Sequence, residues 1–172
     1  MPLVLDATVG GVASNTYCTL AEAETYYLGR LPLAAWAAAS DAEKNAALVM
    51  ATRLLDIKYE WVSWPTATTQ MLQWPRYGVE DFLRLSFIED DAIPPQLKNA
   101  EAEFAGQLLA EDRSLDSDIE TKGVTSLTVG SIAFTFKNSV YAKVIPDAVR
   151  DMIPSWWGVL RGVSFCRELK RW

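Results

Sequence analysis

The stretch PPQLKNAEAEFAGQLL, residues 94–109, carries the strongest helical pattern in the chain. Two prolines open it, and proline suits the first helical position because its φ is already helical and its missing N–H has no partner there. The stretch therefore predicts an amphipathic helix, with Glu101 and Glu103 as charges on its surface. The apolar residues that recur at the spacing of one helical face are Leu97, Ala100, Phe104, Ala105, Leu108 and Leu109.

Two capping boxes predict further helices upstream. Thr-x-x-Glu at 19–22 precedes a predicted helix over 20–28, and Ser-x-x-Glu at 40–43 precedes one that starts at Asp41. An Ala-rich turn or short helix around Trp36 lies between them. The second helix is expected to pack by one face, which leaves Thr52 among its polar positions. The apolar stripe of that face is Ala47, Leu48, Ala51, Leu54, Leu55 and Ile57.

Helical periodicity fades between residues 60 and 93, which is long for a connection in one domain and is typical of a functional loop. Its centre is QWPRYGV, residues 73–79. Trp74 is expected to anchor this loop in the core, and Pro75 fixes its own φ. Arg76 would then project a guanidinium from a stiff base, so the sequence predicts a contact loop. Trp36, Trp61 and Trp64 are expected to be core or loop anchors.

A polar bend follows the helix at 94–109. Its Asp112, Asp116, Asp118 and Glu120 lack the glycine and terminal glutamate of an EF-hand at the required spacing, so a solvated bend is expected. Alternating residues over 124–136, around Gly130, predict a β-hairpin. A last helix is expected from Pro146, with Pro154 kinking or ending it.

These patterns predict a mainly α fold, a small bundle of about four helices with an inserted β-hairpin and an extended C-terminal segment. The chain of 172 residues fits one domain, assigned to 1–160 and followed by a tail at 161–172. We find no membrane-length apolar run and no signal-peptide pattern, and we expect the protein in the cytosol. Cys18 and Cys166 are interpreted as buried thiols, with a disulfide as the minor alternative.

The chain has no histidine and a net charge of −6. Without histidine the usual general base and the usual nitrogen ligand of zinc are missing, so no enzymatic activity, metal or cofactor is expected. The acid excess disfavours general phosphate binding, which needs many cations on one face. In the tail, cations outnumber acids. The combination of these cations with nearby tryptophans is typical of protein interfaces, and a core role for the tryptophans is the alternative. The residues concerned are Trp156, Trp157, Arg161, Arg167, Lys170, Arg171 and Trp172.

The chain resembles a family of tailed-phage structural proteins, the head–tail connector adaptors. The same family also carries the label of DnaT-like single-stranded-DNA-binding proteins. The resemblance rests on SNTYCTLAEAE at 14–24, AW at 35–36, residues 44–55, QWPRYGV at 73–79 and IPPQLKNA at 93–100. The longer C-terminus, rich in Trp and Arg, departs from the family pattern.

As an adaptor, the protein would be a structural virion component of the phage neck, made in the host cytoplasm. The resemblance implies a homo-oligomeric ring of twelve copies that joins the portal to a tail or stopper protein, with DNA passing through the lumen. The implied subunit-interface residues are Trp74, Pro75, Arg76, Tyr77, Leu127, Val129, Ile132 and Phe134. The implied portal-binding residues are Trp156, Trp157, Arg161, Phe165, Arg167, Lys170, Arg171 and Trp172.

The second label implies a different function, a replication accessory protein that binds single-stranded DNA. Such a protein would stack bases on exposed Trp side chains and hold phosphates with Arg76, Arg161, Arg167 and Arg171. Because the acid excess fits a DNA channel that repels the duplex, the sequence favours the adaptor over the DNA binder. An enzyme is the third class, with scattered carboxylates as its only candidates.

Overall fold

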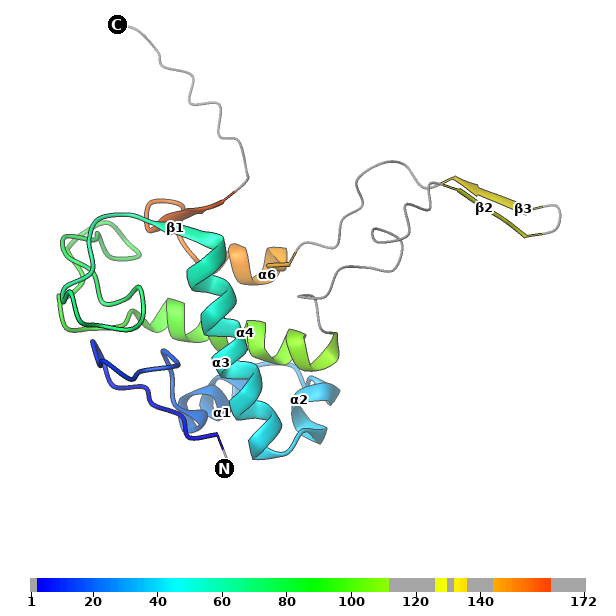
Figure 1. The fold of residues 1–172 in the computed structure, drawn as a ribbon, viewed down its shortest axis with the longest axis horizontal. Coiled ribbons are helices and arrows are strands. Elements are labelled where there is room, and N and C mark those ends of the chain that lie inside the picture. The colour runs from blue at the N-terminus through cyan, green and yellow to red at the C-terminus, as the bar shows by residue number, and fades with distance from the viewer. Residues whose placement is uncertain (1–2, 112–125, 130–131, 136–143, 162–172) are drawn as a thin grey trace, which may run out of the picture.

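Figure 1 shows the fold. A pairing between residues 58–61, at the end of a long helix, and residues 158–161 organises it. The computed structural model describes residues 3–111, 126–129, 132–135 and 144–161. Within them the fold is mainly helical, as predicted. The helices are α1 (Leu20–Leu28), α2 (Ala34–Ala38), α3 (Asp41–Lys58), α4 (Pro95–Ala110) and α6 (Asp147–Arg150). The strands are β1 (Tyr59–Trp61), β2 (Ser126–Val129), β3 (Ile132–Thr135) and β4 (Gly158–Leu160).

The predicted helix starts are confirmed at the level of individual hydrogen bonds. The Thr19 hydroxyl accepts from the Glu22 N–H and the Glu22 carboxylate accepts from the Thr19 N–H, which completes the first capping box. Ser40 and Glu43 repeat this arrangement before α3. Pro95 occupies the first turn of α4. None of the helices in the described ranges is long and apolar enough to span a membrane.

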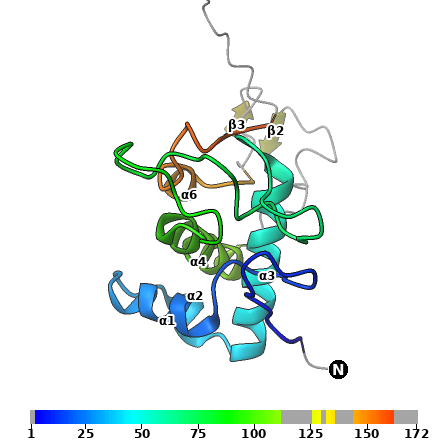
Figure 2. The same cartoon turned by 90° about the vertical axis from the view of Figure 1, so that its left-hand side faces the viewer.

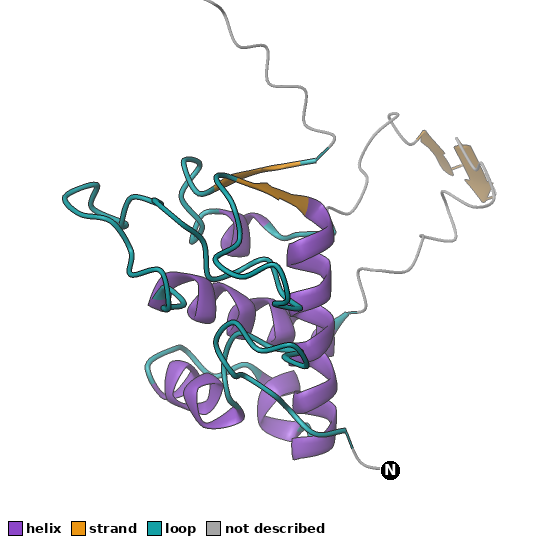
Figure 3. Cartoon of the chain, turned by 60° about the vertical axis from the view of Figure 1, so that its left-hand side comes forward, coloured by secondary structure: helices purple, strands orange, loops and turns teal. Residues whose placement is uncertain are grey.

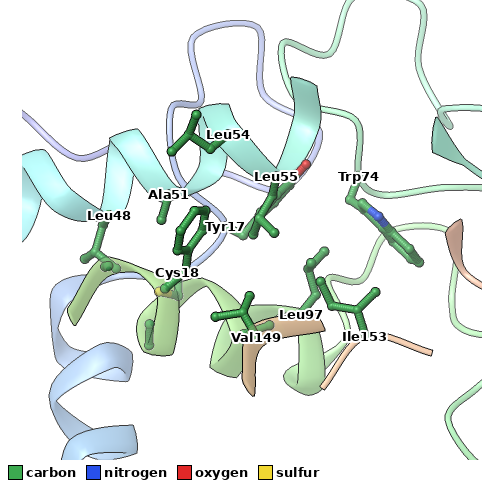
Figure 4. Close-up of a cluster of buried hydrophobic side chains, with 14 of the residues drawn as sticks. Tyr17, Cys18, Leu48, Ala51, Leu54, Leu55, Trp74, Leu97, Val149 and Ile153 are labelled. Atoms are coloured by element: carbon green, nitrogen blue, oxygen red, sulfur yellow. The ribbon is translucent and has the colours of Figure 1, made fainter. Parts of the chain in front are cut away.

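The core lies where α3 crosses α4, as the close-up in Figure 4 shows. Leu48, Ala51 and Leu55 of α3 are fully buried there, and Leu97 of α4 lies on the facing side. Val149 of the one-turn helix α6 closes the cluster. Helices α1 and α2 pack on α4 from another side.

Two small antiparallel sheets complete the described fold. β1 follows α3 without a break and pairs with β4 in the register Glu60 with Val159. This pairing brings the end of α3 next to a segment about a hundred residues further along the chain. β2 and β3 form the predicted hairpin, with Leu127 opposite Phe134 and Val129 opposite Ile132.

Four side chains lie on the opposite side from the one the pattern predicts. Ile57 is exposed, whereas Thr52 is buried. Glu101 and Glu103, predicted as surface charges, are also buried. For the two glutamates the reason is that α4 is enclosed by α1, α2, α3 and α6, so its middle is buried on every side, and a periodicity that assumes one buried face does not apply.

The predicted acidic bend at 112–120 and most of the tail at 161–172 lie outside the described residues, as does Cys166. Cys18 is buried as a free thiol, as predicted. Burial raises the pKa of this thiol well above its usual range.

Candidate functional site

Exposed aromatic side chains gather in one part of the molecule. Where side chains are described, every exposed aromatic residue falls between residues 62 and 88. These four are Trp64, Tyr77, Phe82 and Phe87. We call residues 62–92 the aromatic segment, which forms the long teal loops that run from β1 to α4 in Figure 3. Large aromatic rings on a surface indicate a candidate binding site, because such rings are usually buried.

Trp64 and Tyr77 form a pair on one face of a short antiparallel ladder. The Tyr77 N–H donates to the Trp64 carbonyl at 3.0 Å, and Pro65 is bridged to Arg76. Directly opposed residues in an antiparallel pair place their side chains on the same face, about 5 Å apart at Cβ. Trp64 is 76% exposed and Tyr77 is 47% exposed. Both rings are therefore exposed on the same face of the ladder.

Arg76 holds this ladder together from inside. Its guanidinium donates to the Val62 carbonyl at 2.7 Å, to the Ser63 carbonyl at 2.5 Å and to the Gln73 carbonyl at 2.8 Å. Only 5% of the residue is exposed. The predicted outward projection of Arg76 is therefore wrong. Its guanidinium donates to loop carbonyls that would otherwise be buried without hydrogen-bond donors.

A cluster of indole rings fixes the aromatic segment to the body. Trp74 is buried, as predicted, between Trp61 at 5.8 Å and Trp157 at 5.6 Å between ring centroids. The Trp157 indole N–H donates to the Glu80 carbonyl at 2.7 Å. Trp157 is fully buried, so it belongs to the core and is not part of a docking surface. The neighbouring Trp156 is half-buried.

Residues 79–88 form a hairpin stabilised around Asp81. The Asp81 carboxylate accepts from the Leu85 N–H at 2.9 Å and from the Ser86 hydroxyl at 3.0 Å. The Leu85 N–H is the main cause that lowers the Asp81 pKa. Arg84 lies over the Trp156 ring at 5.3 Å and pairs with Glu80 at 2.6 Å. These contacts hold the hairpin in one conformation.

Two cations lie at the far end of β1 from the aromatic pair. The Arg161 N–H donates to the Lys58 carbonyl at 2.7 Å, so the two residues extend the β1–β4 ladder by one position. Within the described part neither side chain makes an ion pair. Most other described cations are neutralised locally, as Arg30 is by Glu103 at 2.6 Å. Lys58 and Arg161 are therefore cations that a ligand phosphate can reach without displacing a carboxylate.

A cavity of about 750 Å³ lies between α1 and the start of α4, and it is a weaker candidate for an anion site. Arg30 and Lys98 line it, but Arg30 pairs with Glu103 and Lys98 pairs with Glu22 at 2.6 Å. Its charges are thus matched within the protein. An anion would have to compete with both carboxylates, so we do not place the site there.

Two carboxylates, of the buried Glu101 and the half-buried Asp56, connect separate parts of the molecule. The Glu101 carboxylate accepts from the Thr16 hydroxyl at 2.5 Å and from the Thr52 hydroxyl at 2.6 Å, and burial raises its pKa to about 7. Burial also raises the pKa of Asp56 to about 6, although the Tyr17 hydroxyl and the Gln73 N–H both donate to it. Asp56 thereby joins α3 to the aromatic segment.

The structure separates the residues that the sequence grouped. Of the predicted subunit-interface loop, Trp74, Pro75 and Arg76 are buried within the subunit and only Tyr77 is exposed. Leu127, Val129, Ile132 and Phe134 lie in the β2–β3 hairpin, for which only the backbone is described. Of the portal-binding set, Arg161 is exposed. Phe165, Arg167, Lys170, Arg171 and Trp172 lie outside the described residues.

The sequence missed the exposure of Trp64 and did not single out Phe82 or Phe87. Phe82 and Phe87 sit in an apolar run between the acidic pairs Glu80-Asp81 and Glu89-Asp90, without helical periodicity. That pattern indicates an apolar loop. Trp64, which follows β1 by three residues, carries no comparable signal.

Comparison with known proteins gives one match. Residues 1–171 match the family described as "Putative DnaT-like ssDNA binding protein". Neither a curated protein nor a solved structure matches the chain.

This match overturns the favoured prediction of a virion head–tail adaptor and supports its alternative. The prediction was wrong because it used the net charge of the whole chain as a guide to phosphate binding. Net charge does not report where the cations lie, and among the residues that the structure describes Lys58 and Arg161 make no ion pair despite the acid excess.

Proposed function

The chain belongs to the family of putative DnaT-like ssDNA binding proteins, and we propose that it binds single-stranded DNA on the exposed face of the aromatic segment. The observation that carries this proposal is the Trp64–Tyr77 pair, two exposed rings on a ladder that Arg76 holds rigid. Each nucleobase has an apolar face that stacks on such a ring, whatever its sequence. In a duplex these faces are covered by neighbouring base pairs, so the pair favours single strands.

Lys58 and Arg161 supply the phosphate contacts. Trp64 lies six positions after Lys58, a distance of at most ~20 Å in extended chain. A stacked single strand rises ~3.4 Å per nucleotide, so about six nucleotides cover this distance. A strand that stacks a base on Trp64 therefore reaches both cations with its backbone. This length falls within the ~4 to 16 nucleotides that a single-strand-binding domain occupies.

The net charge of −6 limits how much of the affinity is electrostatic. For single strands the logarithm of the binding constant falls by about 0.7 per tenfold increase in salt for each phosphate neutralised. Two cations predict a slope of about −1.4. Stacking, which depends little on salt, supplies the remainder. The acid excess outside the site repels the more highly charged duplex and adds to the preference for single strands.

Fluorescence anisotropy with a labelled oligothymidine tests the proposal. Trp64→Ala should weaken binding by about 5-fold to 150-fold, because a stacked base contributes about 1 to 3 kcal/mol. Trp64→Phe should keep most of the affinity. Leu28→Ala is the matched control, since Leu28 is 87% exposed and lies on α1, away from the segment.

A second pair of variants tests the phosphate contacts. Lys58→Gln and Arg161→Gln should each make the salt slope shallower by about 0.7. Arg53→Gln removes the same charge from an exposed position within α3 and should leave the slope unchanged. If the wild-type protein binds no oligothymidine at low salt, or if Trp64→Ala binds as tightly as the wild type, the proposed site is wrong.

A further inference from the structure

Strand β4 has an open edge. The Arg161 N–H donates to the Lys58 carbonyl at 2.7 Å, and every second residue of an antiparallel pair bonds across it in this way. Val159 therefore bonds across to β1, whereas the N–H and carbonyl groups of Gly158 and Leu160 point away from β1. The sheet has two strands, and within the described ranges no group bonds to these outward N–H and carbonyl groups. In Figure 2 β4 is the red-orange stretch at the top of the body, above α6.

A groove of about 380 Å³ lies beside this edge and is lined by all three residues of β4. Tyr59 of β1 and Ile153, which follows α6, extend its mostly apolar wall. Arg150 and Asp151 also line it and pair with each other at 2.9 Å, so the groove favours an uncharged occupant. An unpaired strand edge next to an apolar groove is a site for strand addition. The backbone of an added strand would bond to the outward groups of β4, and its alternate side chains would fill the groove.

The chain supplies a segment that fits this site. Residues 162–172, which lie outside the described residues, follow β4 directly. Gly162 is the first of them, and glycine is common where a strand reverses. Val163, Ser164 and Phe165 come next, uncharged and alternately apolar and polar, as in a strand with one buried face. Because this segment is attached to β4, its concentration at the edge is far higher than that of a separate chain.

The alternation predicts the register of such a strand. A two-residue reversal at residues 161–162 gives the pairs Leu160–Val163, Val159–Ser164 and Gly158–Phe165. Opposed residues share a face of the sheet. Phe165 would thus cover Gly158, which is buried and has no side chain of its own, and Ser164 would lie on the exposed face. A shift by one position would exchange the two faces and expose Phe165.

We propose that residues 163–165 add to β4 as a third, antiparallel strand and so carry the basic tail to the DNA site. The added strand runs in the same direction as β1, from the Lys58 end toward Trp61. The aromatic segment starts at that end, with Trp64 three positions after Trp61. The tail cations would there meet the phosphates of a DNA strand that is stacked on Trp64. They are Arg167, Lys170 and Arg171.

A disulfide across the predicted register tests the added strand, which does not depend on DNA binding. Val159→Cys with Ser164→Cys places two thiols in a pair whose backbones do not bond to each other. The Cα atoms of such a pair lie about 4.5 Å apart, which suits a disulfide. Cys166→Ser is included to remove a competing thiol. The control is Val159→Cys with Leu169→Cys, whose second position lies beyond the strand. Both proteins should fold, because Val159 is 41% exposed.

Titration in a glutathione redox buffer gives the effective concentration of the two thiols in each protein. It should be at least about tenfold higher for the pair at 159 and 164 than for the control pair. The longer loop of the control accounts for only about threefold. Phe165→Asp should remove most of the difference. Equal values in the two proteins would overturn the added strand. A disulfide-linked dimer, detected by non-reducing mass spectrometry, would also overturn it, because a second copy would then occupy the edge.

Oligothymidine anisotropy tests the delivery of the tail cations, a part that rests on the proposed function. The salt slope of the wild type should be steeper than Lys58 and Arg161 alone predict. Arg167→Gln with Lys170→Gln should make it shallower by about 1.4, with Arg53→Gln as the control. An unchanged slope in a protein whose disulfide closes as expected would overturn the delivery and leave the strand. If the wild type binds no oligothymidine, the proposed function fails, and the disulfide still decides whether the strand forms.

Discussion

The helical body buries Glu101 and the aromatic segment buries Arg76, and the two regions satisfy these ionisable side chains with different partners. In the body, Glu101 accepts from the hydroxyls of Thr16 and Thr52, which come from separate parts of the chain. In the aromatic segment, Arg76 donates to backbone carbonyls within fourteen residues of itself, including those of Val62 and Gln73. Glu101 joins separate elements of the body, whereas Arg76 fixes the shape of one loop.

The difference explains how the two regions divide their work. Because Glu101 connects α3, α4 and the N-terminal stretch through side chains, its loss should weaken the packing of the whole body. Because Arg76 takes up loop carbonyls, the side chains of the loop are left free to face solvent, as Trp64 and Tyr77 do. A buried charge that supports a loop thus permits exposed aromatic rings without regular secondary structure.

The largest effect is expected from Glu101→Ala. The substitution leaves the Thr52 hydroxyl and the Tyr17 N–H buried without their acceptor and opens a cavity. We expect a loss of about 3 to 5 kcal/mol in the free energy of unfolding. Urea denaturation followed by circular dichroism measures it. Glu60→Ala, at an exposed position of β1, should change stability by no more than about 0.5 kcal/mol. A similar small loss for both variants would mean that Glu101 does not join the body.

The pH dependence of stability should be next in size. The pKa of Glu101 is about 7 in the folded protein, against an ordinary value of 4.5. Between these pH values the folded protein binds more protons than the unfolded chain, so stability falls as pH rises. Relative to Glu101→Gln, the wild type should lose about 3 kcal/mol from pH 4.5 to pH 7.

Urea denaturation of both proteins at several pH values checks this prediction. Asp56, whose pKa is also raised, is present in both proteins, so its contribution cancels. Parallel stability curves for the two proteins would show that Glu101 has an ordinary pKa.

Arg76→Ala should lower stability less than the Glu101 substitutions do, but it should affect DNA binding more. The carbonyls of Val62, Ser63 and Gln73 lose a charged donor, and we expect a loss of about 2 to 3 kcal/mol in unfolding free energy. Oligothymidine binding should fall with it, because Trp64 loses its support. Arg53→Ala is the control at an exposed arginine. Retained DNA affinity in Arg76→Ala would show that the ladder keeps its shape without the guanidinium.

The smallest effect on stability is expected from Trp64→Ala. Its ring is 76% exposed, so the free energy of unfolding should change by no more than about 0.5 kcal/mol. Trp74 is also a tryptophan but lies in the buried cluster, so Trp74→Ala should lower the free energy of unfolding by about 3 to 5 kcal/mol. Thermal denaturation of the two variants side by side tests the contrast. Equal losses would mean that Trp64 packs against the body.

The sequence predicted the elements whose signals are local. The capping boxes at 19–22 and 40–43 and Pro95 locate the starts of α1, α3 and α4, because a cap is made within four residues. The alternation at 124–136 predicts the β2–β3 hairpin for the same reason. Trp74 was predicted in the core from its size and its proline neighbour.

The candidate site could be predicted only in part. Tyr77 and Arg161 were among the predicted contact residues and both are exposed. Arg76 was predicted to project outward, and Trp157 was grouped with interface residues, yet both are buried. A Trp or an Arg has the same propensities in either setting, and what decides its burial is the segment that packs over it. For Trp157 that segment is the loop around Glu80, distant in sequence.

The sequence by itself determined where the helices begin, that histidine chemistry is missing and that the chain carries an acid excess. These properties depend on residue identity and on contacts within a few positions. Only the tertiary structure decided that Glu101 is buried, that Trp64 is open to solvent and that Lys58 lies beside Arg161. Those outcomes depend on which distant segments pack together, because exposure and pairing are properties of the assembled fold.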